Sequence, residues 1–171
     1  MSKPVFPDVV AQAKARWLAR WAPVRPLAKA IGRFRAPNTF DAGTSNRFQR
    51  RVLIHLQAGS RPGEVGTFTV NLVVLRADGP LSRINPGNPA RFADGVEGSY
   101  RLGLLLYGHD KWWSVRPGAA GPGGVQTWRP AEGTVGAQAV SAALEAVEVD
   151  IEEALRRINH HLGADGRITT R

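Results

Sequence analysis

The feature that most constrains the fold is a pair of alternating segments between Arg47 and Arg76. Apolar side chains occupy even-numbered positions in both segments: Phe48, Val52, Ile54 and Leu56 in the first, and Phe68, Val70, Leu72 and Val74 in the second. Polar side chains, including His55, Gln57 and Asn71, occupy many odd-numbered positions. A period of two residues is typical of a half-buried β-strand, because successive side chains of a strand point to opposite faces.

The sequence Arg61-Pro62-Gly63 lies between the two segments and predicts a turn. Proline presets φ for the first corner of a turn, and glycine accepts a positive φ at the next one. Pairing about this turn places both even-numbered sets on the same face. We therefore expect residues 48–57 and 66–75 to form an antiparallel hairpin whose even-numbered face belongs to the core.

Two helical patterns flank the hairpin. Near the N-terminus, Ala13, Trp17 and Trp21 recur at spacings of four residues after Pro7-Asp8, which suits a helix start. Near the C-terminus, residues 135–162 carry the longest apolar stripe at spacings of three and four. Helix patterns on either side of strand patterns predict an α+β fold. We expect an antiparallel sheet of about four strands, an N-terminal helix and a long C-terminal helix.

The remaining segments are less clearly patterned. Residues 100–107 are compatible with a buried strand or a short helix, and periodicity does not decide between them. Residues 111–115 predict a strand with one indole on each face. Residues 41–46 predict a turn, 77–98 a long irregular connection, and 116–124 a flexible Pro/Gly-rich loop.

Length and composition indicate one domain. A chain of 171 residues is long enough to form a core without disulfides or bound metals. We expect that core to span about residues 9–162, with loose tails on either side. The absence of cysteine excludes disulfides and cysteine-ligated zinc. No apolar run is long enough for a membrane span, and we expect no signal peptide and no membrane association. These features predict a cytoplasmic protein.

The formal charge of +9 is concentrated near the N-terminus. Residues 1–35 carry eight basic groups against Asp8 alone, and Arg16, Arg20 and Arg25 are the candidate contacts to a nucleic acid or another polyanion. The alternative is compositional. Nineteen arginines against four lysines is a bias that a GC-rich genome produces without any ligand. We expect at most weak polyanion binding without sequence preference.

Several short motifs occur in a consistent order. They include Asn38-Thr39-Phe40, the FTVNL sequence at 68–72, Arg101-Leu102-Gly103 and the DKWW sequence at 110–113. The series resembles the bacterial proteins grouped as domain-of-unknown-function family 4304, over roughly residues 9–162. The resemblance implies an antiparallel sheet with helices, and it supplies no catalytic residues.

Catalytic and metal-binding signatures are missing from the sequence. The four histidines do not form the His-x-x-x-His spacing of a helical zinc site, and no Gly-x-Ser-x-Gly elbow occurs. His160 and His161 are neighbours, and side chains of adjacent helical residues diverge too far to share a metal easily. We therefore predict no catalytic residue, no metal site and no cofactor.

The best candidate site combines the polar face of the hairpin with the DKWW turn. Its members are polar or aromatic residues that the predicted sheet would bring near one face: His55, Gln57, Asn71, Arg101, Asp110, Lys111, Trp112 and Trp113. Adjacent indoles on a strand face opposite ways, so we expect one of them to be partly accessible beside Arg101. The alternative is that other elements cover this face and that an Arg101–Asp110 pair fixes the turn.

Two function classes remain. The first is a non-enzymatic binding or protein-interaction module whose partner is a protein or a small ligand. The alternative is a nucleic-acid-associated protein that uses the basic N-terminal region. The aromatic residues are needed inside the fold, which favours the first class.

Overall fold

The predicted hairpin is the centre of the molecule. The structure is a computed structural model that describes residues 4–24, 38–44, 50–76 and 96–161. Strands β3 (Arg51–Ala58) and β4 (Thr67–Leu75) pair antiparallel, with His55 opposite Asn71 and Ile54 opposite Leu72. The two segments pair with both even-numbered sets on one face, as predicted, although Phe48 lies outside the described residues.

The turn between these strands is a short 3-10 helix, η2 (Pro62–Glu64). The buried Glu64 carboxylate accepts hydrogen bonds from the backbone N–H groups of Ser60 and Arg61, at 2.9 and 3.2 Å. The Thr67 hydroxyl donates to the Glu64 carbonyl oxygen at 2.6 Å. The Glu64 carboxylate therefore satisfies the backbone N–H groups of the turn that contains Pro62 and Gly63, and in this way stabilises the connection between the two strands.

The sheet is larger than expected. Within the described part of the chain it has seven strands, in the order β1-β2-β3-β4-β6-β7, with β5 also paired to β4. The other strands are β1 (Ala22–Pro23), β2 (Thr39–Thr44), β5 (Val96–Arg101), β6 (Lys111–Ser114) and β7 (Gln126–Trp128). The prediction of about four antiparallel strands is therefore wrong in number, and β6 and β7 run parallel. The α+β class is confirmed.

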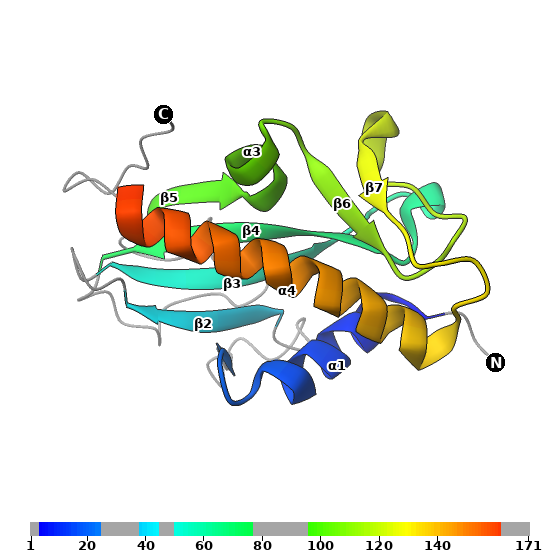
Figure 1. The fold of residues 1–171 in the computed structure, drawn as a ribbon, viewed down its shortest axis with the longest axis horizontal. Helices are drawn as coiled ribbons and strands as arrows, with labels where there is room; N and C mark the ends of the chain where they lie inside the picture. The colour runs from blue at the N-terminus through cyan, green and yellow to red at the C-terminus, as the bar shows by residue number, and fades with distance from the viewer. Residues whose placement is uncertain (1–3, 25–37, 45–49, 77–95, 162–171) are drawn as a thin grey trace.

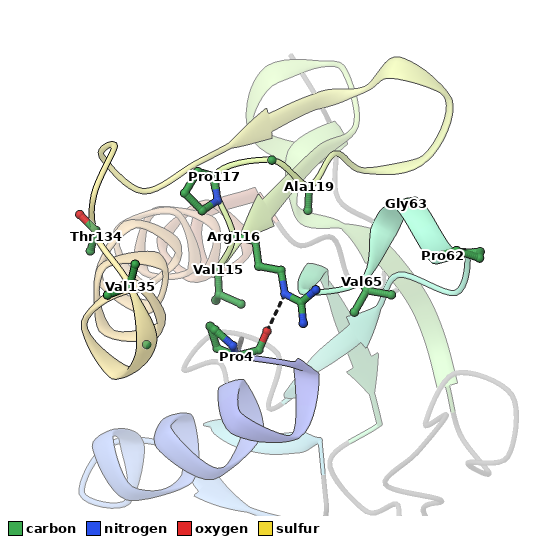
Figure 2. A pocket seen from close by; sticks show the side chains of 12 residues that line it. Pro4, Pro62, Gly63, Val65, Val115, Arg116, Pro117, Ala119, Thr134 and Val135 are labelled. Carbon is green, nitrogen blue, oxygen red and sulfur yellow. Dashed lines mark hydrogen bonds between the residues drawn. The ribbon is translucent and has the colours of Figure 1, made fainter. Parts of the chain in front are cut away.

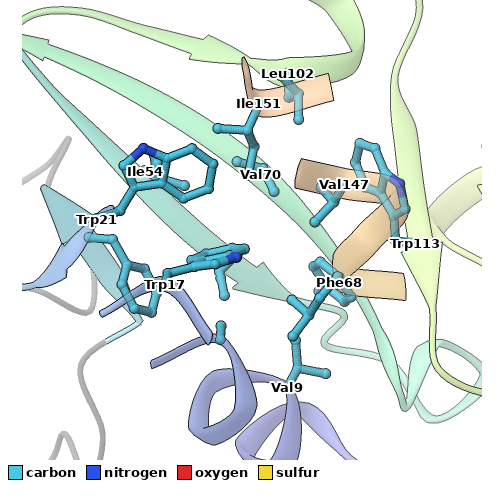
Figure 3. Close-up of a cluster of buried hydrophobic side chains, with 14 of the residues drawn as sticks. Val9, Trp17, Trp21, Ile54, Phe68, Val70, Leu102, Trp113, Val147 and Ile151 are labelled. Atoms are coloured by element: carbon cyan, nitrogen blue, oxygen red, sulfur yellow. The ribbon is translucent and has the colours of Figure 1, made fainter. Parts of the chain in front are cut away.

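The even-numbered face of the hairpin carries the main core, as predicted. Helices α1 (Phe6–Trp17) and α4 (Gly136–His161) cover this face, and α4 crosses in front of β3 and β4 (Figure 1). Figure 3 shows Trp17 of α1, with Val147 and Ile151 of α4, packed over the hairpin side chains. The Trp17 ring meets Phe40 edge-on, with 4.9 Å between ring centroids.

The opposite face is also partly apolar. Val24, Leu53, Val73 and Leu75 form a second buried cluster there, beside the polar residues of the hairpin. The odd-numbered positions are thus apolar at one end of the hairpin and polar at the other. The polar residues His55, Gln57 and Asn71 therefore lie at the end of this face nearer the turn.

Three weakly patterned segments differ from the predictions. Residues 100–107, which periodicity left open, divide into the end of β5 and a short helix, α3 (Leu102–Tyr107). Residues 41–44 belong to β2 rather than to a turn, because a bulge with Gly43 at φ 84° keeps the strand paired. Residues 96–98, expected to be irregular, belong to β5, and residues 77–95 lie outside the described ranges.

The long C-terminal helix agrees closely with its predicted range of 135–162. Its predicted stripe is buried at Val140, Leu144, Val147, Ile151 and Ile158. None of the helices in the described ranges has the length and apolar character needed to cross a membrane.

Candidate functional site

The polar residues predicted for the hairpin do lie together. The Asn71 amide donates to Gln57 Oε1 at 2.9 Å, and its nitrogen lies 3.2 Å from His55 Nδ1. Asn38 approaches the other side of the ring, with 3.3 Å between its Nδ2 and His55 Nε2. His55 is only 7% exposed. Antiparallel pairing of β3 with β4 is what places these side chains side by side.

The polar network extends to the next strand and to the DKWW turn. Arg101 donates to Gln57 Oε1 at 3.2 Å, and its Nε lies 3.6 Å from Asp110 Oδ1. The Trp112 indole N–H donates to Asp110 Oδ2 at 3.0 Å. The Arg101 guanidinium lies 5.7 Å from the centre of the Trp112 ring. The network therefore links β3, β4, β5 and β6 through mutual contacts.

The prediction of an accessible indole is wrong. Trp113 faces the main core at 0% exposure, stacked on Phe68, and Trp112 faces the opposite side at 3% exposure. The loop after β6 covers Trp112, because a Cβ added to Gly121 would lie 2.7 Å from the Trp112 ring. The residues beside Trp112 that remain partly exposed are Arg101 and Asp110, whose side chains are 26% and 29% exposed. Their contacts fix the turn, as the structural alternative predicted.

Part of the loop predicted at residues 116–124 is packed and hydrogen-bonded to the residues that follow it. Gly121 donates its N–H to Thr127 Oγ1 at 2.9 Å, and Arg129 Nε donates to the Ala119 carbonyl oxygen at 3.0 Å. Ala119 and Gly121 are buried. Glycine is needed at 121 because the chain passes directly over an indole, rather than because the segment acts as a linker.

Lys111 does not join the polar network. Its side chain is on the helix-covered face, where Nζ lies 2.9 Å from Asp150 Oδ2 of α4 and 4.6 Å from the Tyr107 ring centre. The Tyr107 hydroxyl donates to Asp150 Oδ1 at 2.5 Å. Asp150 is 7% exposed and Tyr107 is 46% exposed, so this partly buried cluster of Tyr107, Lys111 and Asp150 ties α3 and β6 to the long helix.

The hydrogen bond to Asp150 raises the pKa of Tyr107 to about 12, and burial and the charge of Asp150 act in the same direction. A raised pKa means that the folded state holds the proton more tightly than the unfolded state. The protonated Tyr107 hydroxyl therefore stabilises the folded state fully below pH 10, and this stabilisation is lost as pH rises toward 12. We expect the difference in ultraviolet absorbance between wild type and Tyr107→Phe to show an ionisation near pH 12. Ionisation of Tyr107 at its ordinary value of 10.0 would contradict the contact.

Two of the candidate nucleic-acid residues, Arg16 and Arg20, form ion pairs with α4 on the protein surface. Arg16 pairs with Glu148 of α4, and Arg20 Nη1 lies 2.5 Å from Glu152 Oε1. The Trp17 indole also donates to Glu148, at 2.6 Å. Arg25 lies outside the described residues. Because these acidic partners compensate Arg16 and Arg20, the charge of these two arginines gives little support to polyanion binding.

None of the predicted site residues lines the cavity shown in Figure 2. It has a volume of about 570 Å³ and lies between the chain before α1, the hairpin turn, the loop after β6 and the start of α4 (Figure 2). Its lining is mostly proline, glycine and small apolar side chains, with one hydroxyl: Pro4, Pro62, Gly63, Val65, Val115, Arg116, Pro117, Gly118, Ala119, Thr134, Val135 and Gly136. Arg116 is the one charged side chain among these described residues.

Sequence reasoning missed this cavity because its walls come from four segments that are remote in the chain. No single segment carries a recognisable motif. The signal in the sequence is the Pro/Gly-rich composition of 116–124, and that composition predicts only a flexible loop. Within the described ranges, no three His, Cys, Asp or Glu side chains gather closely enough to hold a metal ion.

Comparisons of the chain with protein-family models, with curated proteins and with solved structures found no match, so the resemblance to family 4304 stays a prediction.

Proposed function

We propose that this protein is a non-enzymatic binding module and that the cavity beside Arg116 is its ligand site. The observation that carries the proposal is a cavity of about 570 Å³ with a mainly apolar lining and few polar groups. Small-molecule sites typically have this size and composition. Val65 and Val135 on its wall are 40% and 63% exposed, so the cavity offers apolar surface that a ligand would remove from water.

Binding is favoured over catalysis by the chemistry of the lining. Arg116 is its one ionisable side chain among the described residues, and an arginine keeps its proton at all ordinary pH values. It is therefore a poor general acid or base, whereas it is well suited to holding a ligand. Among the lining residues no side chain can act as a general base to activate the Thr134 hydroxyl as a nucleophile, since Arg116 stays protonated.

Replacing Ala119 with phenylalanine tests the site. The Ala119 methyl group lies on the cavity wall, so a benzyl group there is expected to occupy the space of a ligand (Figure 2). We expect 4-phenylbutan-1-ol to shift the amide resonances of Gly118 and Thr134 saturably in wild type. In Ala119→Phe its affinity should fall by at least about tenfold, because ligand and side chain compete for one volume.

Val149→Phe is the matched control, because Val149 is 68% exposed on α4 and does not line the cavity. It should bind the alcohol like wild type. Thermal unfolding of both variants establishes that they are folded. Equal affinity of wild type and a folded Ala119→Phe variant would place the alcohol elsewhere and refute the proposed site.

A further inference from the structure

The cavity is built around one arginine whose backbone is fixed. The Val115 N–H donates to the Gly66 carbonyl oxygen at 2.9 Å. The Arg116 N–H donates to Ser114 Oγ at 3.0 Å, and the same hydroxyl donates to the Arg116 carbonyl oxygen at 2.6 Å. These bonds hold the start of the loop against the hairpin turn and direct the Arg116 side chain into the cavity (Figure 2).

The side chain is held along its length as well. Gly66 has φ 84°, and a Cβ there would lie 2.9 Å from Arg116 Cδ and 3.0 Å from Cγ and Nε. Glycine is therefore required twice, for its backbone conformation and for the space that the arginine stem occupies. On the other side, Arg116 Nε donates to the Pro4 carbonyl oxygen at 3.0 Å. A bond at Nε fixes the plane of the guanidinium group and with it the direction of its terminal nitrogens.

We propose that the ligand is a small amphipathic monocarboxylate, whose carboxylate pairs with the Arg116 guanidinium while its apolar body fills the rest of the cavity. This inference rests on the proposed function and specifies its ligand. A planar guanidinium matches the two oxygens of a carboxylate, and such charge-assisted pairs are stronger than neutral hydrogen bonds. Among the described lining residues no aspartate or glutamate opposes an anion.

The apolar lining argues for a single negative charge. A phosphate dianion needs several donors to replace its hydration, whereas this lining has one cationic side chain and one hydroxyl. A carboxylate on a hydrocarbon or aromatic body leaves one charge to be compensated and an apolar surface to be buried. Arg116 also forms part of the rigid wall, so little side-chain entropy remains to be lost on binding.

Three probes of nearly equal shape and different charge test the inference: 4-phenylbutyrate, 4-phenylbutan-1-ol and 4-phenylbutylamine. By titration calorimetry on the wild-type chain, we expect the acid to bind at least about tenfold more tightly than the alcohol, and the amine more weakly than both. In Arg116→Met the advantage of the acid over the alcohol should disappear, so that the ratio of their affinities falls to about one. Arg116→Lys should retain part of it, because lysine keeps the charge without the fork.

Arg156→Met is the matched control, because it removes the same charge about 30 Å along α4 from Gly136 on the cavity wall. It should preserve the order of the three probes. Equal binding of acid and alcohol to wild type would overturn the carboxylate proposal and leave the cavity as a ligand site. If none of the three bound, the proposed function would fail together with it. The wild-type series decides the matter even if an Arg116 variant does not fold.

Discussion

Replacing Ile54 with alanine is expected to lower the free energy of unfolding by about 2–4 kcal/mol. Ile54 is fully buried in the main core, between the Trp17 region of α1 and the Ile151 region of α4. The truncation removes apolar contacts and leaves a cavity between layers that cannot fully collapse, since helices and sheet are fixed by their other contacts. Val70→Ala, on the same face of β4, should also be destabilising through the same mechanism. Urea unfolding followed by circular dichroism measures both.

The control for these core variants is Val149→Ala on the exposed side of α4. It should change the free energy of unfolding by no more than about 0.5 kcal/mol. Comparable losses in all three variants would mean that α1 and α4 do not cover the even-numbered face.

Replacing Asp150 with alanine is expected to cost about 3–5 kcal/mol, because it leaves a buried ammonium group without its partner. Lys111 has a side-chain exposure of 15%, and its Nζ lies 2.9 Å from Asp150 Oδ2. The Tyr107 hydroxyl loses its acceptor at the same time. Chemical denaturation near neutral pH measures the loss, and the raised pKa of Tyr107 should return toward 10.0 in this variant.

A double-mutant cycle separates the ion pair from the packing. Lys111→Met in the Asp150→Ala background removes the uncompensated charge, so the double variant should be more stable than Asp150→Ala alone. Additive losses would contradict the contact. Arg156→Met serves as control, because its partner Glu153 is on the surface of the same helix and such exposed pairs contribute little.

The core face of the hairpin and the buried face of α4 were predictable from sequence because both depend on short-range periodicity. The alternation specifies which face of the hairpin each residue occupies, so His55 and Asn71 were expected on the same face. The spacing of three and four residues from Val140 onward specifies the inward side of a helix in the same way. In both cases one segment of chain contains the whole signal.

The DKWW turn shows what a local sequence pattern cannot predict. Alternation correctly placed Trp112 and Trp113 on opposite faces, but it could not show that residues after β6 return to cover Trp112. The prediction of about four strands was wrong for a similar reason. Short strands such as β1 and β7 have too few residues for a period, and they pair because longer strands offer them an edge.

The sequence by itself determined the central hairpin, its core face, the two helices and the α+β class, since these follow from hydrophobic periods within continuous segments. Only the tertiary structure decided which acidic residues pair with the arginines and where the cavity lies. Arg16 and Arg20 meet glutamates more than a hundred residues away, and Arg116 meets Pro4 and Gly66. Such contacts depend on how whole layers pack, and packing between distant segments leaves no period in the chain.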